Sequence, residues 1–106
     1  MPPALNRALW GQSLEQLRAR REALIALADR HKAENVRVFG SVARGEESEN
    51  SDVDLLVHFR QGASLFDLIH LIEDTSALID TKVDIVSDGG LSPYLAKRIL
   101  AEAVPL

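Results

Sequence analysis

Residues 36–59 read VRVFGSVARGEESENSDVDLLVHF, and this stretch decides the fold. It predicts a strand over Val36–Phe39, a Gly-Ser turn that opens a small helix at Ser41–Arg44, a polar loop, and a second strand that ends at Phe59. Successive side chains of a strand point to opposite faces, so the aspartates at positions 52 and 54 project from one side of the sheet. The intervening apolar residues face the core: Val53, Leu55, Val57 and Phe59.

Two like charges, Asp52 and Asp54, lie side by side on this second strand. At about 4 Å and an effective dielectric constant near 20, two such charges repel by roughly 4 kcal/mol. A pair of this kind is retained where a proton or a cation lies between the carboxylates. Because carboxylate oxygens are hard ligands, the pair predicts a site for Mg²⁺ or Mn²⁺.

The Gly40-Ser41 turn predicts a phosphate site at the end of the first strand. Backbone N–H groups at a helix start bind anions, and a glycine permits close approach. The Ser41 hydroxyl adds a donor, and Arg44 either contacts phosphate or pairs with Glu46 or Glu47. Ten residues separate Ser41 from the first aspartate. A phosphate site followed by metal-binding carboxylates indicates phosphoryl or nucleotidyl transfer.

A third acid, Asp84, interrupts the apolar run of another predicted strand, Lys82–Val86. If this strand lies beside the second one, Asp84 joins the face of the other two aspartates. Three carboxylates can hold two Mg²⁺ ions about 3.5–4 Å apart, one activating an attacking hydroxyl and one binding a triphosphate. Asp84, placed nearest the acceptor, would take the proton from that hydroxyl.

The composition is that of a globular protein and argues against a nucleic-acid-binding one. The 106 residues predict one domain, and 46% hydrophobic with 26% charged residues is ordinary for a soluble protein. A net charge of −4 lacks the basic excess of a nucleic-acid binder. The chain has no cysteine, which excludes disulfides and a thiolate nucleophile. Without a signal-peptide pattern or a membrane-length apolar run, we expect a cytoplasmic protein with no membrane contact.

Helices are predicted on either side of these strands. Capping residues and apolar periodicity place them at 14–32, 65–77 and 93–103. Residues 1–12 are expected to form a flexible N-terminal segment before the domain at 13–106. The order is then α-β-α-β-α-β-α, an α/β (α+β) fold with a small mixed three-stranded sheet flanked by helices.

Gly40-Ser41, ten intervening residues and Asp52-Val53-Asp54 resemble the motif of the polymerase-β-type nucleotidyltransferase superfamily. The fuller string GSVARGEESENSDVDLLV is similar to the minimal nucleotidyltransferases, antitoxins of about this length that pair with HEPN-domain ribonuclease toxins. The similarity runs from the first helix through the VDIV strand to the final helix with Ile99–Ala103. Fixed spacing and strand context agree, which makes the motif specific.

The resemblance implies roles for particular residues. Catalytic metal ligands for two Mg²⁺ ions would be Asp52, Asp54 and Asp84, and nucleotide-binding residues would be Gly40, Ser41, Arg44 and Ser51. It implies transfer of AMP from ATP to a hydroxyl, expected to be that of a tyrosine, of a cognate HEPN toxin in a hetero-oligomer without direct nucleic-acid contact. Relatives often have glycine before the third strand, where this chain has Asp80; aspartate also tolerates left-handed backbone geometry.

Two other interpretations stay open. The protein could be a non-catalytic antitoxin that neutralises its toxin by binding and occlusion, with inherited but idle acids; the intact Gly-Ser turn and three acids favour the enzyme. A nucleotidyltransferase for a small molecule is disfavoured, because the expected domain leaves no second domain for such an acceptor unless a homodimer supplies the pocket. The nucleotide base, the acceptor residue and the number of AMP groups are not encoded in a recognisable pattern.

Overall fold

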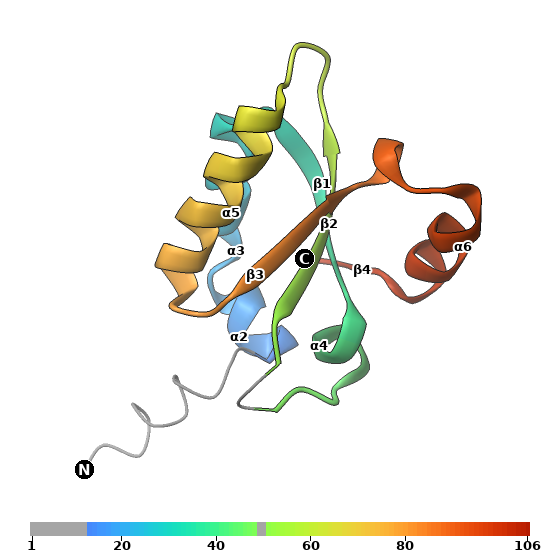
Figure 1. Cartoon of the computed structure of the whole chain (residues 1–106). Coiled ribbons are helices and arrows are strands. Elements are labelled where there is room, and N and C mark those ends of the chain that lie inside the picture. Colours follow the sequence, from blue (N-terminus) through green and yellow to red (C-terminus); the bar gives the residue numbers. More distant parts are fainter. Residues whose placement is uncertain (1–12, 49–50) are drawn as a thin grey trace.

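The computed structural model describes residues 13–48 and 51–106, so the segment predicted to be flexible, residues 1–12, lies outside the described residues. The elements in chain order are α2 (Leu14–Ala19), α3 (Arg21–Arg30), β1 (Ala33–Phe39), α4 (Gly40–Arg44), β2 (Val53–Phe59), α5 (Leu65–Ile79), β3 (Val83–Ser87), the 3₁₀ turn η1 (Asp88–Gly90), α6 (Pro93–Glu102) and β4 (Val104–Pro105) (Figure 1). No helix among these residues is long and apolar enough to cross a membrane.

One mixed sheet, with strand order β3-β2-β1-β4, runs through the centre of the molecule. β2 is antiparallel to β1 and parallel to β3, and β4 pairs antiparallel with the outer edge of β1. Helices α2, α3 and α5 lie on one side of the sheet, and α6 lies on the other side beside α4 (Figure 1). The predicted mixed α/β class with flanking helices is confirmed.

The predicted number of three strands is wrong, because the sheet of the described chain has a fourth strand, β4. Its residues Val104 and Pro105 pair with Val38 and Arg37 of β1. Two residues are too short to show an alternating pattern, and proline normally argues against a strand except at an edge. β4 is such an edge, and the buried Leu106 continues it by donating its N–H to the Val36 carbonyl at 3.1 Å.

The apolar alternation of β2 forms the main core, as predicted. Val53, Leu55 and Val57 are buried and pack with side chains of α3 and α5. On the opposite face, which carries the aspartates, Leu56 is also fully buried. That face is therefore covered along part of its length, a feature that the alternation of acids and apolar residues did not predict.

The single helix predicted over 14–32 is two helices, α2 and α3, separated at Arg20. Its predicted capping box is present: Gln16 N donates to Ser13 Oγ at 3.1 Å, and Ser13 N donates to Gln16 Oε1 at 2.8 Å. The apolar stripe continues through the interruption, because Leu17 and Leu24 are both buried. The break therefore leaves the packing of this segment on the core unchanged.

Asp80 ends α5 in the left-handed conformation, with φ 52° and ψ 45°. The expectation that aspartate adopts this geometry in place of glycine is confirmed. Left-handed backbone costs most side chains roughly 1–2 kcal/mol, aspartate less and glycine nothing.

We predict that Asp80→Gly keeps or raises the free energy of unfolding, by up to about 1 kcal/mol, because glycine adopts positive φ without strain. Asp80→Val should lower it by roughly 1–2 kcal/mol, since a β-branched residue is strained there. Chemical denaturation measures both. A shift of the same sign in both variants would show that backbone conformation is not what limits this position.

Candidate active site

The candidate site lies at the end of the sheet where β1 finishes and β2 and β3 begin. Phe39, the last residue of β1, pairs with Asp54 of β2, and Asp54 pairs with Asp84 of β3. Residues paired across neighbouring strands project to the same face of the sheet. The expectation that Asp84 shares the face of Asp54 is therefore confirmed. Asp52 lies two residues before Asp54, with a half-exposed side chain.

Gly40 brings the backbone of the β1–α4 turn directly against Asp54. It adopts a φ of +75°, and a Cβ atom there would lie 2.2 Å from Asp54 Oδ2. This position therefore requires glycine twice, once for its conformation and once for space. The result is that the backbone at Gly40 lies directly against the Asp54 carboxylate.

Asp54 carries an electrostatic strain that a cation would relieve. Its pKa is raised, first by burial and then by the charges of Asp84, Asp52 and Glu102, whereas Arg44 acts in the opposite direction. Lys82 is weakly placed to compensate these charges, because its Nζ is 3.9 Å from Asp52 Oδ2 and the lysine is exposed. The acids thus lack full compensation by the positive side chains around them.

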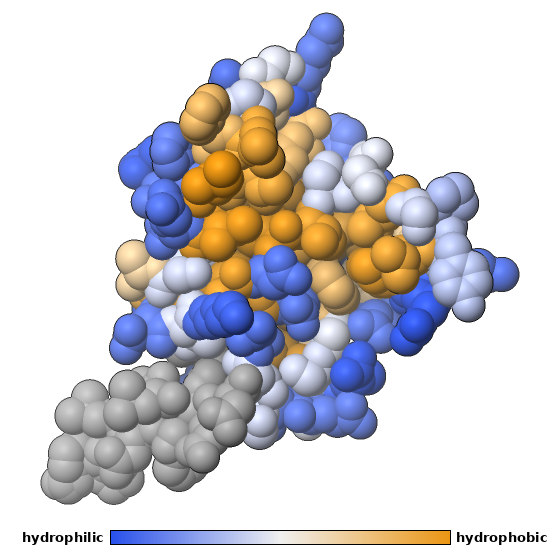
Figure 2. All heavy atoms as spheres, viewed as in Figure 1, coloured by the Kyte–Doolittle hydropathy of each residue, from blue (hydrophilic) through white to orange (hydrophobic). Residues whose placement is uncertain are grey.

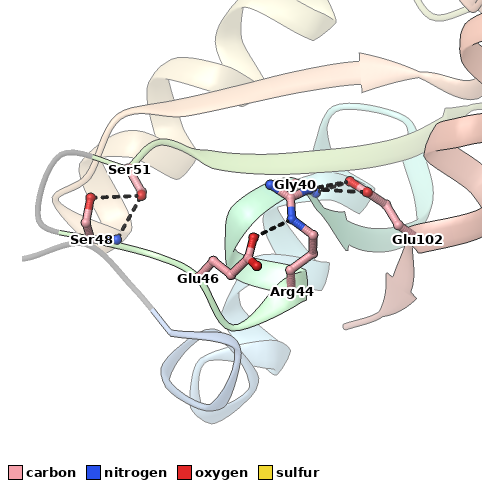
Figure 3. Close-up of polar contacts among 6 residues, drawn as sticks. All are labelled: Gly40, Arg44, Glu46, Ser48, Ser51 and Glu102. Carbon is pink, nitrogen blue, oxygen red and sulfur yellow. Dashed lines mark hydrogen bonds and ion pairs between the residues drawn. The ribbon is translucent and has the colours of Figure 1, made fainter.

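Arg44 forms two ion pairs at the edge of the site (Figure 3). Its Nε donates to Glu46 Oε1 at 2.8 Å, and its Nη1 lies 3.3 Å from both carboxylate oxygens of Glu102. The hydrogen bond to Glu46 is the main reason that the pKa of Arg44 is raised. Of the two roles left open for Arg44, the ion pair to Glu46 is present, and a phosphate contact stays a prediction.

Glu102 is a site residue that the sequence did not reveal. Its Oε1 accepts a hydrogen bond from Gly40 N at 2.7 Å (Figure 3). The pairing of Val104 with Val38 brings the end of α6 close to the end of β1, where Gly40 begins α4. Without a prediction of β4 and its pairing with β1, the sequence gives no sign that Glu102, the last residue of α6, lies beside Gly40.

The two predicted serines lie in different surroundings. Ser41 belongs to the first turn of α4, next to Gly40, and the predicted role of its hydroxyl stays a prediction. Ser51 Oγ instead accepts a hydrogen bond from Ser48 N at 2.8 Å within the polar loop (Figure 3). The structure thus places Gly40, Ser41 and Arg44 on one short element, while a nucleotide-binding role for Ser51 stays a prediction.

The donor set fits a hard divalent cation. Among residues 13–48 and 51–106, no group of three or more carboxylate, imidazole or thiol side chains, Asp52, Asp54 and Asp84 included, is arranged so that it could hold a metal ion by itself. Mg²⁺ does not need such an arrangement, because it keeps several waters and binds through one or two carboxylates together with substrate phosphates. The carboxylates of Asp54 and Asp84, on paired residues of adjacent strands, and that of neighbouring Asp52 supply oxygens of this type.

Comparison with known proteins identifies the family of this chain. Residues 20–106 match the nucleotidyltransferase domain family. Protein adenylyltransferase MntA of Thermococcus cleftensis is 42% identical over 78 residues, 74% of this chain and 79% of its own length. A proposed protein adenylyltransferase of Methanocaldococcus jannaschii is 38% identical over 81 residues, 76% of this chain and 87% of its own. The chain therefore belongs to the nucleotidyltransferase domain family.

Solved structures support the same architecture. A proposed minimal nucleotidyltransferase is 54% identical, with a TM-score of 0.81 over 90% of this chain and 97% of its own. A more distant match, at 18% identity and a TM-score of 0.64, covers 83% of this chain and 69% of a chain from the complex of tri-AMPylated Shewanella oneidensis HEPN toxin with MNT antitoxin. At that identity the likeness shows the fold, which is the minimal nucleotidyltransferase fold predicted from the sequence.

We predict that Gly40→Ala is more damaging than Gly45→Ala, which serves as its matched control. Both glycines have positive φ, but a Cβ at position 40 meets Asp54, whereas one at position 45 has nothing within 4 Å. Each variant should lose about 1 kcal/mol of unfolding free energy from backbone strain, and Gly40→Ala should lose more, because the added Cβ must displace the Asp54 carboxylate. Only Gly40→Ala should in addition lower nucleotide affinity, by about tenfold or more, measured by calorimetry. Equal affinities would contradict the close approach to Asp54.

We predict that Asp54→Asn stabilises the fold at pH 7, because the raised pKa means that ionised Asp54 opposes folding. This opposition is complete above the folded-state pKa and disappears as the pH falls below the ordinary value of 3.8. The melting temperature should rise by roughly 2–4 °C at pH 7, a modest amount because solvent screens part of the effect. Near pH 3, where Asp54 is protonated, the variant should match the unsubstituted protein.

Asp88→Asn is the control of opposite sign. Burial alone would raise the pKa of Asp88, but hydrogen bonds from His58 and Arg37 lower it. Ionised Asp88 therefore stabilises the fold above the unfolded-state pKa, and this contribution is lost as the pH falls through the folded-state pKa. Asp88→Asn should lower the melting temperature at pH 7. Stabilisation by both substitutions would point to net charge instead of these local environments.

Proposed function

We propose that this nucleotidyltransferase is an antitoxin that transfers AMP from ATP to a hydroxyl, expected to be that of a tyrosine, of a cognate HEPN ribonuclease toxin. The observation that carries the proposal is the pairing of Asp54 with Asp84 on one sheet face, directly beside Gly40. Relatives at 38–42% identity bear the name protein adenylyltransferase. An antitoxin chain that shares the fold was solved in complex with an AMPylated HEPN toxin.

Asp52, Asp54 and Asp84 are the residues that would hold two Mg²⁺ ions, or Mn²⁺ in their place. Bound there, the ions would polarise the triphosphate and lower the pKa of the acceptor hydroxyl. They would also relieve the repulsion that raises the pKa of Asp54. The N–H of Gly40, the hydroxyl of Ser41 and the charge of Arg44, together with Ser51, would hold the β- and γ-phosphates.

The transfer forms one bond and breaks one. The acceptor oxygen attacks the α-phosphorus of ATP, and the bond from that phosphorus to the oxygen of the β-phosphate breaks. Pyrophosphate leaves with both electrons of that bond, and the hydroxyl proton passes to Asp84. Asp84 suits this role because it is exposed on β3, an edge strand of the sheet, where a protein acceptor can approach. We place the reaction in the cytoplasm, where ATP is available.

We predict that the purified protein, mixed with a cognate HEPN protein, ATP and Mg²⁺, increases the mass of that partner by one or more AMP units. Asp52→Ala and Asp54→Ala should slow the transfer at least about 100-fold, because the Mg²⁺ ions that these aspartates would hold stabilise the transition state by several kcal/mol. EDTA should stop it. Intact-protein mass spectrometry measures each reaction.

Asp29→Asn is the control for the loss of an acid, since Asp29 is exposed on α3 and pairs with Arg60 away from the site. It should retain full activity. If the toxin is neutralised without any change in mass, the protein acts by occlusion and the enzymatic proposal is wrong. Transfer to a small molecule instead of the partner would contradict the proposed acceptor.

A further inference from the structure

The carboxylate of Glu102 binds the groups that the proposed function assigns to the triphosphate. One oxygen accepts from Gly40 N at 2.7 Å, and both oxygens lie 3.3 Å from Arg44 Nη1. Carboxylate and phosphate oxygens are equivalent partners for a backbone N–H and a guanidinium group, and both make charge-assisted hydrogen bonds with them. Because Gly40 has a single N–H donor and Glu102 also holds Nη1 of Arg44, Glu102 and a phosphate group compete for these donors.

Glu102 also adds a negative charge to a site that already has three. Its charge acts on Asp54 in the same direction as those of Asp84 and Asp52. A nucleoside triphosphate that enters would meet four carboxylates and add several negative charges of its own. Glu102 thus opposes nucleotide binding in two ways, by occupying the donors and by repelling the ligand.

The contact can be released without disturbing the core. Glu102 is the last residue of α6, and none of the ten residues of that helix is fully buried. Figure 2 shows apolar side chains gathered over α5 and extending towards α6, where Tyr94, Leu95 and Leu100 remain exposed. A glutamate side chain reorients about its own rotatable bonds, and segments with few buried contacts are the ones that move first.

We propose that Glu102 is a gate for the nucleotide: in the free protein its carboxylate occupies Gly40 and Arg44, and it swings away when the triphosphate binds. This inference rests on the proposed function, because it regulates access to the same site. Glu102 is an internal competitor that lowers the affinity for nucleotide and keeps Arg44 oriented towards the site until the ligand arrives.

The first test is independent of nucleotide and of activity. The amide resonance of Gly40 in a ¹H–¹⁵N spectrum of the full chain reports its hydrogen bond to Glu102. In Glu102→Gln the Gly40 resonance should move upfield, because a neutral acceptor makes a weaker hydrogen bond than a carboxylate. In Glu46→Gln it should stay in place, since Glu46 contacts Arg44 but is not bonded to Gly40. An unmoved resonance in Glu102→Gln overturns the gate.

The second test measures the affinity for AMP-PNP with Mg²⁺ by calorimetry. Glu102→Gln should bind about 5–10-fold more tightly than the unsubstituted protein, the change expected for roughly 1 kcal/mol of removed competition. Glu46→Gln makes the same chemical change at the same arginine and should alter the affinity less than twofold. If Glu102→Gln is unstable, Glu102→Ala replaces it in this measurement, with its folding checked by thermal melting. Glu102→Ala should bind AMP-PNP at least as tightly as is expected for Glu102→Gln.

The outcomes separate the gate from the function. If the unsubstituted protein binds AMP-PNP and transfers AMP, but Glu102→Gln has the same or weaker affinity, the gate is wrong and the proposed function stands. If no variant binds AMP-PNP although the Gly40 resonance moves in Glu102→Gln, the contact exists but the proposed function fails, and the gate fails with it. Equal tightening in Glu102→Gln and Glu46→Gln would overturn the gate in favour of a general charge effect.

Discussion

Backbone hydrogen bonds of the sheet hold Asp54 opposite Asp84, and the rest of the site depends on this constraint. The pairing of β2 with β3 fixes the two Cα positions, so the side chains can reduce their repulsion only by rotation. Gly40 borders the Asp54 carboxylate from the end of β1, because its backbone lies directly against Asp54. Acids held together in this way, with the pKa of Asp54 raised, are typical of functional sites.

The opposite face of the same strand provides the stabilisation that makes this arrangement tolerable. Val53, Leu55 and Val57 point away from the face that carries the acids, and they are buried against α3 and α5. Burying one such side chain contributes roughly 1.5–3 kcal/mol, and these residues make up much of the main core. Core residues and aspartates lie on the same strand. A shift of one residue in the register of this strand would therefore expose the apolar residues and bury the aspartates.

The C-terminal part of the chain approaches the site on the face of the sheet that carries the acids. β4 pairs with β1 near the point where β1 ends, and this pairing delivers Glu102 to Gly40 and Arg44. Further along the same face, Asp88 binds both Arg37 and His58 and thereby ties η1 to the sheet. Helix α6 therefore lies between two anchored points, η1 before it and Glu102 at its end, and none of its residues is fully buried.

The sequence by itself determined the parts that depend on local patterns. Alternation over residues 53–59 placed the apolar residues in the core and the aspartates opposite, and the fixed Gly-Ser to Asp-x-Asp spacing identified the fold family. The left-handed Asp80 was expected because relatives often have glycine at this position and aspartate tolerates the same conformation. Tertiary structure decided what depends on pairing between distant segments: the parallel alignment of Asp84 with Asp54, the burial of Leu56 on the acidic face, the fourth strand and the arrival of Glu102. Hydrogen-bond register between strands far apart in the chain leaves no periodic trace in either strand, and a two-residue strand containing proline leaves none at all.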